Sequence, residues 1–261
     1  MPDRFHPVAL VSGAAEGLGA AFARSLARRG CDLVLLDRKG PELEAVSAEL
    51  RATFAVNVRP LVEDLADPSS AHRVEVACRS LDLGLVVLNA AEARVGDVVA
   101  TPFADACRVI DTNIKGSLGL VCAVVPGMQA RRRGAVLIVG SNAGLIGHTR
   151  TAVYGATKAF GVRLGESLFA ELAPFGVDVR VACPGAVSTP AFARSGARVW
   201  APLVAPPTVV AEQALASFDA PGPVVVLGRS NRALMAGLRA LPRRLAVRLL
   251  DRVMRATYPE G

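Results

Sequence analysis

Short apolar segments alternate along the chain with longer segments of helical periodicity, and no other feature restricts the fold as strongly. Several of the short segments are apolar at almost every position rather than at every second one, among them VALVS, LGLVVLNAA and GAVLIVGS. Strands have this composition when both faces of their sheet are covered, which is usual in parallel sheets. Strands that alternate with helices build βαβ units. The sequence therefore predicts an α/β fold with a doubly wound parallel sheet flanked by helices.

Seven segments are expected to be strands, and helical patterns lie between most of them. The strand segments are 8–12, 32–37, 58–64, 83–91, 134–141, 177–185 and 222–228, and the helical ones are 17–29, 41–53, 68–81, 102–133 and 151–174. Pro41 and Pro68 suit the first turn of a helix, and Gly30, Gly134 and Gly176 follow helical patterns as C-terminal signals. No linker or internal repeat divides the 261 residues, so one domain is expected.

The net charge of +7 is concentrated near the end of the chain. Residues 229–261 hold eight arginines against two acidic residues, and the preceding 228 residues are nearly neutral. A nucleic-acid-binding protein would spread such charge over a face and interleave it with aromatic residues, which are only 5% of this chain. We therefore expect no nucleic-acid partner.

The five cysteines are scattered and form no CxxC pair, so neither a disulfide framework nor a metal site is predicted. The opening MPDRFHPVALVSG carries an acidic residue and no long apolar run, which is untypical of a signal peptide. No uninterrupted apolar run approaches the ~20 residues of a membrane span. These features favour a soluble, cytoplasmic protein.

Three glycines, Gly13, Gly17 and Gly19, occupy the predicted turn between the first strand and the first helix, in LVSGAAEGLGAAFA. A glycine turn lets the backbone approach a pyrophosphate, and the helix N-terminus offers it free N–H groups. The spacing is GxxxGxG rather than GxGxxG, and a purely structural turn is the alternative. The strand before and the helix after favour a Rossmann-type dinucleotide site, with residues 1–228 as the dinucleotide-binding and catalytic domain.

With Ser12, the glycine segment begins a series of short motifs that resembles the classical short-chain dehydrogenases/reductases. The series continues in order through LNAA, DTNIKG, VGSNAG, YGATK and PGAVSTP, and it covers about residues 7–190. Ser141 lies thirteen residues before Tyr154. Two positions depart from the family's NNAG segment, because Leu88 replaces its first asparagine and Ala91 replaces its glycine. The departures put the local backbone geometry in doubt.

A tyrosine and a lysine four residues apart, Tyr154 and Lys158, carry the predicted chemistry. A carbonyl that accepts a hydride must also gain a proton on its oxygen, so an acid–base group must lie close by. Free phenol, with a pKa of about 10, is a reluctant base near neutrality. One helical turn away, the ammonium group of Lys158 is expected to lower the pKa of Tyr154. An isolated YxxxK would be an ordinary exposed helix face.

The resemblance implies two further catalytic residues. Ser141 would hydrogen-bond the reacting oxygen, and Asn113 would hold a water that connects Lys158 to solvent. From the residues alone, Asn113 would be a capping or kinking residue in an apolar helical pattern, and Ser141 the start of a loop.

Asp37, at the end of the second predicted strand, favours NAD, because a carboxylate there accepts hydrogen bonds from ribose and repels a 2′-phosphate. Arg38 and Lys39 follow it and leave NADP as the alternative, since two cations could hold that phosphate. Asp64 resembles the family residue beside the adenine, or is an acidic residue at a helix N-terminus. The resemblance implies a cofactor-binding set of Ser12, Gly13, Gly17, Leu18, Gly19, Asp37, Arg38, Asp64, Leu65, Asn89, Ala90, Tyr154, Lys158, Pro184, Gly185, Val187 and Thr189.

The segment after Thr189 and the chain end are the candidates for enclosing a substrate. Residues 190–207 contain the only tryptophan, Trp200, among apolar, glycine and proline residues that suit a mobile lid and an apolar substrate. Residues 229–261 form a basic amphipathic helical tail, bent at Pro242. Its predicted apolar stripe comprises Leu234, Leu238, Leu241, Leu245, Leu249 and Val253. The tail could lie on an anionic membrane, cover a pocket or oligomer contact, or pack on its own domain, and the resemblance favours packing on protein.

Together these features predict an NAD(P)-dependent oxidoreductase that interconverts a hydrophobic secondary alcohol and a ketone or aldehyde, with a small molecule as substrate. A homo-oligomer, dimer or tetramer, is expected, and the resemblance extends to the steroid-dehydrogenase-like branch of the family. The alternative is a weakly active or inactive nucleotide-sensing or scaffolding protein on the same fold.

Overall fold

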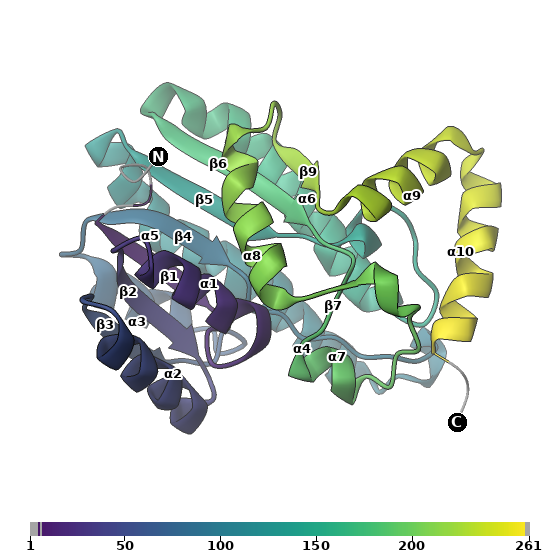
Figure 1. Cartoon of the computed structure of the whole chain (residues 1–261), viewed down its shortest axis with the longest axis horizontal. Helices are drawn as coiled ribbons and strands as arrows, with labels where there is room; N and C mark the ends of the chain where they lie inside the picture. The colour runs from purple at the N-terminus through teal and green to yellow at the C-terminus, as the bar shows by residue number, and fades with distance from the viewer. Residues whose placement is uncertain (1–4, 6, 259–261) are drawn as a thin grey trace.

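The computed structural model describes residue 5 and residues 7–258, and a seven-stranded sheet forms its centre (Figure 1). The strand order is β3-β2-β1-β4-β5-β6-β9, and each neighbouring pair is parallel. The strands are β1 Val8–Ser12, β2 Asp32–Asp37, β3 Val58–Val62, β4 Leu83–Leu88, β5 Gly134–Val139, β6 Val177–Cys183 and β9 Val224–Val226. A separate pair joins β7 Ala186–Val187 to β8 Val204–Ala205. The seven strands and the doubly wound parallel sheet predicted from the sequence are confirmed.

Helices cover both faces of the sheet (Figure 1). One face packs against α1, α2 and α8, and the other against α3, α5 and α6. The helices are α1 Gly17–Ala27, α2 Gly40–Thr53, α3 Ser70–Cys78, α4 Phe103–Ile110, α5 Ser117–Arg131, α6 Ala152–Leu172, α7 Pro190–Arg194, α8 Pro207–Ala216, α9 Arg229–Ala240 and α10 Arg243–Thr257. Single turns occur at η2 Val98–Ala100, η4 Asn142–Gly144, η5 Ala173–Phe175, η6 Ala201–Leu203 and η7 Ser217–Asp219.

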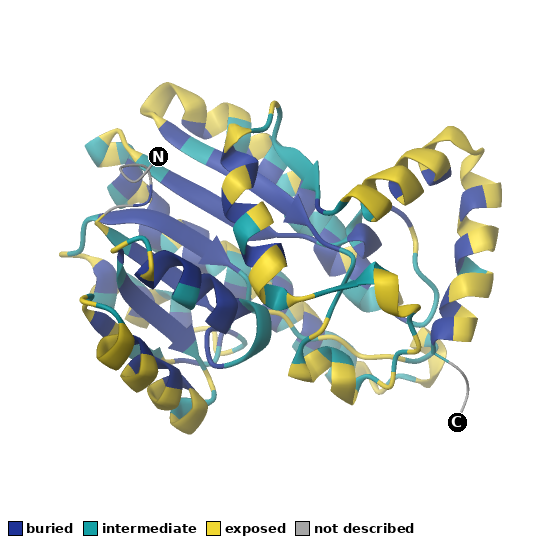
Figure 2. Cartoon of the chain, viewed as in Figure 1, coloured by how far each residue is buried: buried dark blue, intermediate teal, exposed yellow. Residues whose placement is uncertain are grey.

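Burial of the sheet on both faces explains why its strands are apolar throughout. In β1, Ala9 and Val11 belong to the core on the α1 side, and Leu10 belongs to the core on the α5 side. All three side chains are fully buried. Because successive side chains point to opposite faces of the sheet and both faces are covered, a polar residue at any position of the strand would be buried without a partner. Figure 2 shows this as continuous burial along the central strands, with exposure on the outer sides of the helices and on the loops.

Most of the expected helix boundaries agree with the structure, and one proline position differs. Pro41 lies in the first turn of α2, as expected. Gly176 adopts φ +68° after α6, and Gly134 follows α5 as the first residue of β5, both as expected. Pro68 instead precedes α3, whose N-cap is Ser69, so its assignment to a first turn was wrong. The proline therefore ends the preceding loop rather than beginning the helix.

The longest helical segment of the sequence runs without interruption through a π-helical turn. Residues Asp111–Gly116 form this turn, named η3, between α4 and α5. Among the described residues, the combined segment Phe103–Arg131 is the one helix that is long and apolar enough to cross a membrane. Its most apolar 18-residue stretch has a mean hydropathy of 1.3, and 44% of that stretch is buried. The buried core helices of α/β proteins can be equally long and apolar. Here α5 packs on α3 and β4, as a core helix does. Polar residues interrupt its apolar run, so the sequence alone did not indicate a membrane span here.

Helix α6 approaches the sheet closely at Gly165. A Cβ atom built on Gly165 would lie 2.1 Å from Val181 Cγ2 and 3.2 Å from Ile138 Cδ1. Val181 is a fully buried β-branched residue that has little freedom to move away. We expect Gly165→Ala to lower the free energy of unfolding by about 1–3 kcal/mol through overpacking, as measured by denaturant unfolding.

Gly161, one turn earlier on the same helix, is the matched control. A Cβ atom there would lie 3.5 Å from Ile138 Cγ2, which is an ordinary contact. Alanine has the higher helix propensity, so Gly161→Ala should be neutral or stabilising by up to about 1 kcal/mol. Equal destabilisation by the two variants would contradict the close approach at Gly165.

The tail predicted from the sequence consists of the two helices α9 and α10, which are separated at Pro242 as expected. Their buried side chains are Met235, Leu238, Ala246, Leu250 and Met254, and most of these pack on Ile146 in the loop after β5. The predicted stripe was therefore wrong about which residues pack. Of its members only Leu238 is buried, while Leu234, Leu241, Leu245, Leu249 and Val253 are exposed. The expectation that the tail packs on protein rather than lying free agrees with the structure, in which the other stripe packs against Ile146 of the same domain.

Candidate functional site

The carboxyl ends of the parallel strands meet at one edge of the sheet, and the candidate site residues follow them. Ser12 ends β1, Asp37 ends β2, Asn89 follows β4 and Ser141 follows β5. Open α/β sheets bind their ligands at this edge. The fold thus gathers residues that are distant in sequence.

The three glycines of the first turn are required by close backbone contacts. Gly13 and Gly17 have φ values of +68° and +58°, which L side chains rarely adopt. A Cβ on Gly19 would lie 1.8 Å from the carbonyl oxygen of Gly13. At the same turn α1 begins, and its N-cap Glu16 makes no side-chain capping bond. The turn therefore leaves a bare helix N-terminus of the kind that fits a pyrophosphate.

The LNAA segment holds the glycine turn in place despite its two departures from the family pattern. Asn89 Nδ2 donates to the carbonyl oxygens of Ser12 and Gly13 at 2.9 and 3.2 Å. The Ser12 hydroxyl accepts from the N–H of Asn89 and of Ala90 at 3.0 and 3.2 Å. Leu88 is the buried last residue of β4, so its replacement of asparagine extends the core. The geometry of this segment is intact.

Tyr154 and Ser141 share a hydrogen bond between their side chains. Tyr154 lies in the first turn of α6, and Ser141 is the N-cap of η4, where its hydroxyl also accepts from the N–H of Ala143 at 3.1 Å. Burial raises the pKa of Tyr154 above its usual value, and the bond to Ser141 opposes that rise. The two side chains therefore lie together at the sheet edge, as a tyrosine and serine pair that could exchange a proton with a ligand.

Lys158 is 8% exposed and lies beside the ring of Tyr154, with its Nζ 5.7 Å from the ring centroid. Its ammonium group donates to the carbonyl oxygen of Val139 at 2.8 Å. Within the described residues this is its single hydrogen bond, so two N–H donors remain for a ligand such as a ribose. Burial lowers the pKa of Lys158 to about 8. The expectation that Lys158 lowers the pKa of Tyr154 is not met in the ligand-free chain, because burial of the phenol dominates.

Asn113 lies in the π-helical turn η3, where it joins the helix to two other parts of the site. Its Nδ2 donates to Thr157 Oγ1 at 2.9 Å and to the carbonyl oxygen of Glu92 at 2.8 Å, and its Oδ1 accepts from the N–H of Glu92 at 2.7 Å. Thr157 in turn donates to the carbonyl oxygen of Tyr154 at 2.8 Å. The widened turn brings this amide into contact with α6, which agrees with the frequent occurrence of π-turns at functional sites.

Asp37 fixes the backbone at the adenosine end of the site. Its carboxylate accepts from the N–H of Ala15 and of Lys39, both at 3.0 Å. Asp64 lies nearby and accepts from Ala66 N at 3.0 Å and from Arg108 Nη2 at 2.8 Å. These bonds lower the pKa of Asp64 against the opposing effect of burial. The Asp64 carboxylate therefore stays ionised near neutrality.

The remaining predicted cofactor residues surround the same edge. Pro184 and Gly185 follow β6, and a Cβ on Gly185 would meet the amide of Asn231 at 2.4–2.8 Å. Thr189 caps α7 by accepting from the N–H of Phe192 at 3.1 Å. Val187 lies in β7, Leu18 packs beside the core on the α1 side, and Leu65 is buried under η3. All of the predicted positions therefore lie near the sheet edge, while their roles stay a prediction.

A family model described as short chain dehydrogenase matches residues 7–199 of the chain. The chain belongs to the short-chain dehydrogenase family.

Three relatives of this short-chain dehydrogenase illustrate the match. A very-long-chain 3-oxoacyl-CoA reductase of Aspergillus clavatus is 34% identical over 177 residues, 66% of this chain and 51% of the relative. A short-chain dehydrogenase from Sphingobium yanoikuyae, solved in complex with NADPH, has a TM-score of 0.80 and 34% identity, and the match covers 89% of this chain and 93% of that one. A solved 7beta-hydroxysteroid dehydrogenase has a TM-score of 0.87 and 25% identity over 95% and 98% of the two chains. The chain spans about half the length of the first curated relatives it matches.

Sequence reasoning missed an ion-pair group around the glycine turn of this short-chain dehydrogenase. Glu16 pairs with Lys39 Nζ at 3.0 Å and with Arg194 Nη2 at 2.5 Å. Arg194 is the last residue of α7, so the pair ties the segment after Thr189 to the glycine turn. Glu92 similarly pairs with Arg38 and, at 3.1 Å, with Arg108. The signal available in the sequence was an acidic residue inside the glycine motif.

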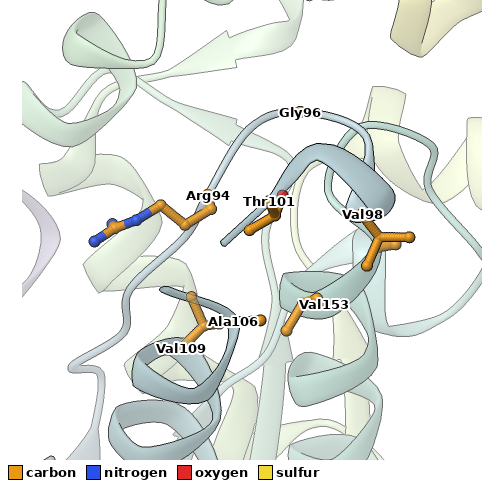
Figure 3. Close-up of a pocket in the computed structure, with 8 residues that line it drawn as sticks. Arg94, Gly96, Val98, Thr101, Ala106, Val109 and Val153 are labelled. Atoms are coloured by element: carbon orange, nitrogen blue, oxygen red, sulfur yellow. The ribbon is translucent and has the colours of Figure 1, made fainter. Parts of the chain in front are cut away.

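Two hollows of the described surface lie close to the candidate site residues but are not lined by Tyr154 or Ser141. Figure 3 shows a small cavity, about 10 Å³, between the loop at Gly96, α4 and the start of α6 at Val153. It has room for about one water. A larger hollow of about 410 Å³ lies between α6, β9 and α9, and Arg163, Glu166, Arg239 and Arg243 are among its lining residues. Tyr154 and Ser141, which line neither hollow, are both partly exposed.

Proposed function

We propose that this short-chain dehydrogenase is an NAD-dependent oxidoreductase that interconverts a hydrophobic secondary alcohol and its ketone. The observation that carries the proposal is the hydrogen-bonded pair of Tyr154 and Ser141, with the ammonium group of Lys158 beside the phenol ring. Such a unit can supply a proton to an oxygen at the moment that a hydride reaches the adjacent carbon. A binding-only protein would not need this buried arrangement.

In the direction of reduction, Tyr154 donates its phenolic proton to the carbonyl oxygen, and Ser141 orients that oxygen by a hydrogen bond. The bound nicotinamide dinucleotide would supply the hydride. Lys158 holds a ribose hydroxyl with its two free donors and stabilises the phenolate that forms. Asn113 fixes the catalytic helix through Thr157 and so keeps Tyr154 in position. In oxidation the same groups act in reverse.

An apolar substrate is supported by the segments near the site. Trp200 and residues 190–203 follow the candidate cofactor residue Thr189, and Arg198 N–H donates to the carbonyl oxygen of Thr257 at 2.8 Å, which closes this segment against α10. Two relatives carry names that point to large hydrophobic substrates, a very-long-chain 3-oxoacyl-CoA reductase and a 7beta-hydroxysteroid dehydrogenase. A parallel turnover screen of hydrophobic alcohols and ketones with NAD and NADP tests the proposal, and absence of turnover across it would favour a sensing or scaffolding role.

The preference for NAD over NADP rests on five charged residues at the adenosine end. Asp37 presents a carboxylate there, and the two neighbouring cations are already paired, Arg38 with Glu92 and Lys39 with Glu16. A 2′-phosphate would have to compete with these carboxylates for the cations and would be repelled by Asp37. The proposal also includes a cytoplasmic homo-oligomer, which the scattered free cysteines and the family resemblance support.

We expect Asp37→Ala to raise the ratio of kcat/KM with NADP to kcat/KM with NAD by about tenfold or more, about 1.4 kcal/mol. The reason is the loss of a carboxylate that repels phosphate and binds ribose. Steady-state kinetics with both dinucleotides measure the ratio.

The matched control is Asp32→Ala at the opposite end of β2. Asp32 also accepts from backbone, at 2.7 Å from Asn57 N, but it lies at the amino end of the strand, away from the site. Asp32→Ala should therefore leave the ratio of kcat/KM with NADP to kcat/KM with NAD unchanged. An unchanged ratio in Asp37→Ala would remove Asp37 from the cofactor site.

A further inference from the structure

Helix α10 carries two apolar stripes, and only one of them is covered. We call α9 and α10 together the arm. The inner stripe of α10 comprises Ala246, Leu250 and Met254, and these side chains are buried against α9, against Ile146 or within the arm. The outer stripe is formed by Leu245, Leu249 and Val253, which are 52%, 47% and 51% exposed. Their spacing of four residues places them along one side of a helix that is about 22 Å long. The outer stripe therefore has no protein partner in the described chain.

Further exposed apolar residues lie on the same arm and on the loop tied to it. Leu234 of α9 and Leu241 at the bend are 46% and 39% exposed. Trp200, the only tryptophan of the chain, is 72% exposed and lies two residues after Arg198, whose N–H donates to Thr257 at the end of α10. Figure 2 shows the arm of α9 and α10 at the margin of the molecule, with most of its surface exposed. Tryptophan is favoured where an apolar surface meets water.

The exposed apolar stripe is bordered by arginines that lack acidic partners. Of the eight arginines in α9 and α10, Arg255 alone has an ion pair in the described part of the chain, with Asp251 at 3.1 Å. Arg244, Arg248 and Arg252 are exposed on α10, and Arg252 lies between Leu249 and Val253 on its helical turn. An exposed apolar stripe with a positively charged border has the properties of an interfacial helix.

The charge decides between a membrane and a second copy of the chain as the occupant of this face. A two-fold contact would bring the unpaired arginines of two arms together, and like charges so placed oppose association. An anionic bilayer offers an apolar layer for the leucines and negative headgroups for the arginines. We propose that the outer face of α9 and α10, with Trp200, docks this protein on an anionic membrane surface.

This docking deepens the proposed function, because the same arm closes the substrate segment. The inner stripe packs on Ile146 in the loop after Ser141, and the end of α10 holds Arg198. A hydrophobic alcohol or ketone dissolved in the bilayer would then enter beside the arm without crossing water. The docking surface contains no residue of the catalytic or cofactor set.

Vesicle flotation tests the proposal with the full chain and phosphatidylcholine vesicles that contain or lack phosphatidylserine. We expect binding at least about tenfold stronger to the anionic vesicles, falling as salt is raised. Leu249→Ser should weaken it about tenfold, because an apolar side chain no longer enters the interface. Arg252→Gln should weaken it about fivefold, since one basic residue near the surface contributes about 1 kcal/mol.

Two exposed residues at α3 serve as matched controls. Val76 is 54% exposed and the side chain of Arg79 is 69% exposed. Val76→Ser and Arg79→Gln should leave vesicle binding unchanged. Dinucleotide binding and turnover of a soluble alcohol should be the same in all four variants, which separates a failure of docking from a failure of the proposed chemistry.

Three outcomes would overturn the proposal. The first is a wild-type protein that does not float with the anionic vesicles and stays in the soluble fraction. The second is binding that Leu249→Ser does not reduce, which would move the contact to another face. The third is a lower subunit number for Leu249→Ser than for wild type in light scattering, which would assign the outer stripe to a contact between copies.

Discussion

Tyr154→Phe is expected to lose about 10²–10⁴-fold in turnover while it binds dinucleotide normally. The ring keeps its packing against Lys158, so the variant removes the phenolic proton and the hydrogen bond to Ser141 and little else. Steady-state kinetics give the turnover, and fluorescence titration gives the dinucleotide affinity. Retention of more than about a tenth of wild-type turnover would show that another group transfers the proton.

Tyr258→Phe is the natural control for this experiment, because the chain has only these two tyrosines. Tyr258 lies after α10, and its phenol is hydrogen-bonded to Ser195 of the substrate segment. Burial raises its pKa as well, so an elevated phenol pKa alone does not distinguish the two residues. We expect a change of less than about tenfold, mostly in KM, because Tyr258 is placed to shape the pocket rather than to transfer a proton.

Lys158→Met is expected to have the second largest effect, a loss of about 10²-fold or more in kcat/KM together with weaker dinucleotide binding. Methionine fills similar space but removes the charge and the two donors left for a ribose. In contrast to Tyr154→Phe, this variant should lose affinity for the dinucleotide as well as turnover, since a hydrogen bond to a charged group contributes about 1.5–3 kcal/mol. Unchanged affinity would exclude Lys158 from ribose binding.

The same variant has a pH signature in the ligand-free protein. The pKa of Lys158 is lowered from 10.5 to about 8, so the folded state binds fewer protons than the unfolded state between these values. Below pH 8 the ammonium is charged in both states and its burial penalty, about 3 kcal/mol, is fully present. Lys158→Met should therefore be more stable than wild type below pH 8, and this difference should shrink as pH rises from 8 to 10.5.

Urea unfolding of both proteins across this range measures the difference. The raised pKa values of Tyr154 and Cys183 lower stability at high pH in both proteins, so the comparison removes most of that contribution. A difference in stability that stays constant with pH would contradict the lowered pKa of Lys158.

Local pattern was sufficient to predict the sheet. Leu33 to Leu36 are buried on both faces of β2, and a short apolar run between two aspartates is typical of a strand in a parallel sheet. The order of motifs along the chain similarly predicted which residues would meet at the sheet edge, because parallel strands end together. Pro68 was misplaced since proline is accepted both in a first turn and just before one.

Features that depend on contacts between distant segments were not predictable. The π-helical turn at Asn113 depends on Glu92 and Thr157, neither of which is a sequence neighbour. The pairing of Glu16 with Arg194 joins residues 178 positions apart. In the tail, apolar residues repeat at helical spacing on both stripes of α10, so periodicity alone could not tell which stripe meets the domain. The packing on Ile146 decides this, and it requires the folded loop after β5.

The position of α10 in the chain also bears on how the protein is made. Residues 8–226 contain the whole sheet, and α10 comes later from the ribosome, so the dinucleotide half can fold while the arm is still being synthesised. During that interval Ile146 and the neighbouring loop lack their cover, and a newly made chain exposes an apolar patch beside its reaction centre. At about 5–20 residues per second, synthesis of α9 and α10 takes a few seconds, and a chaperone would have to protect the open site for at least this time.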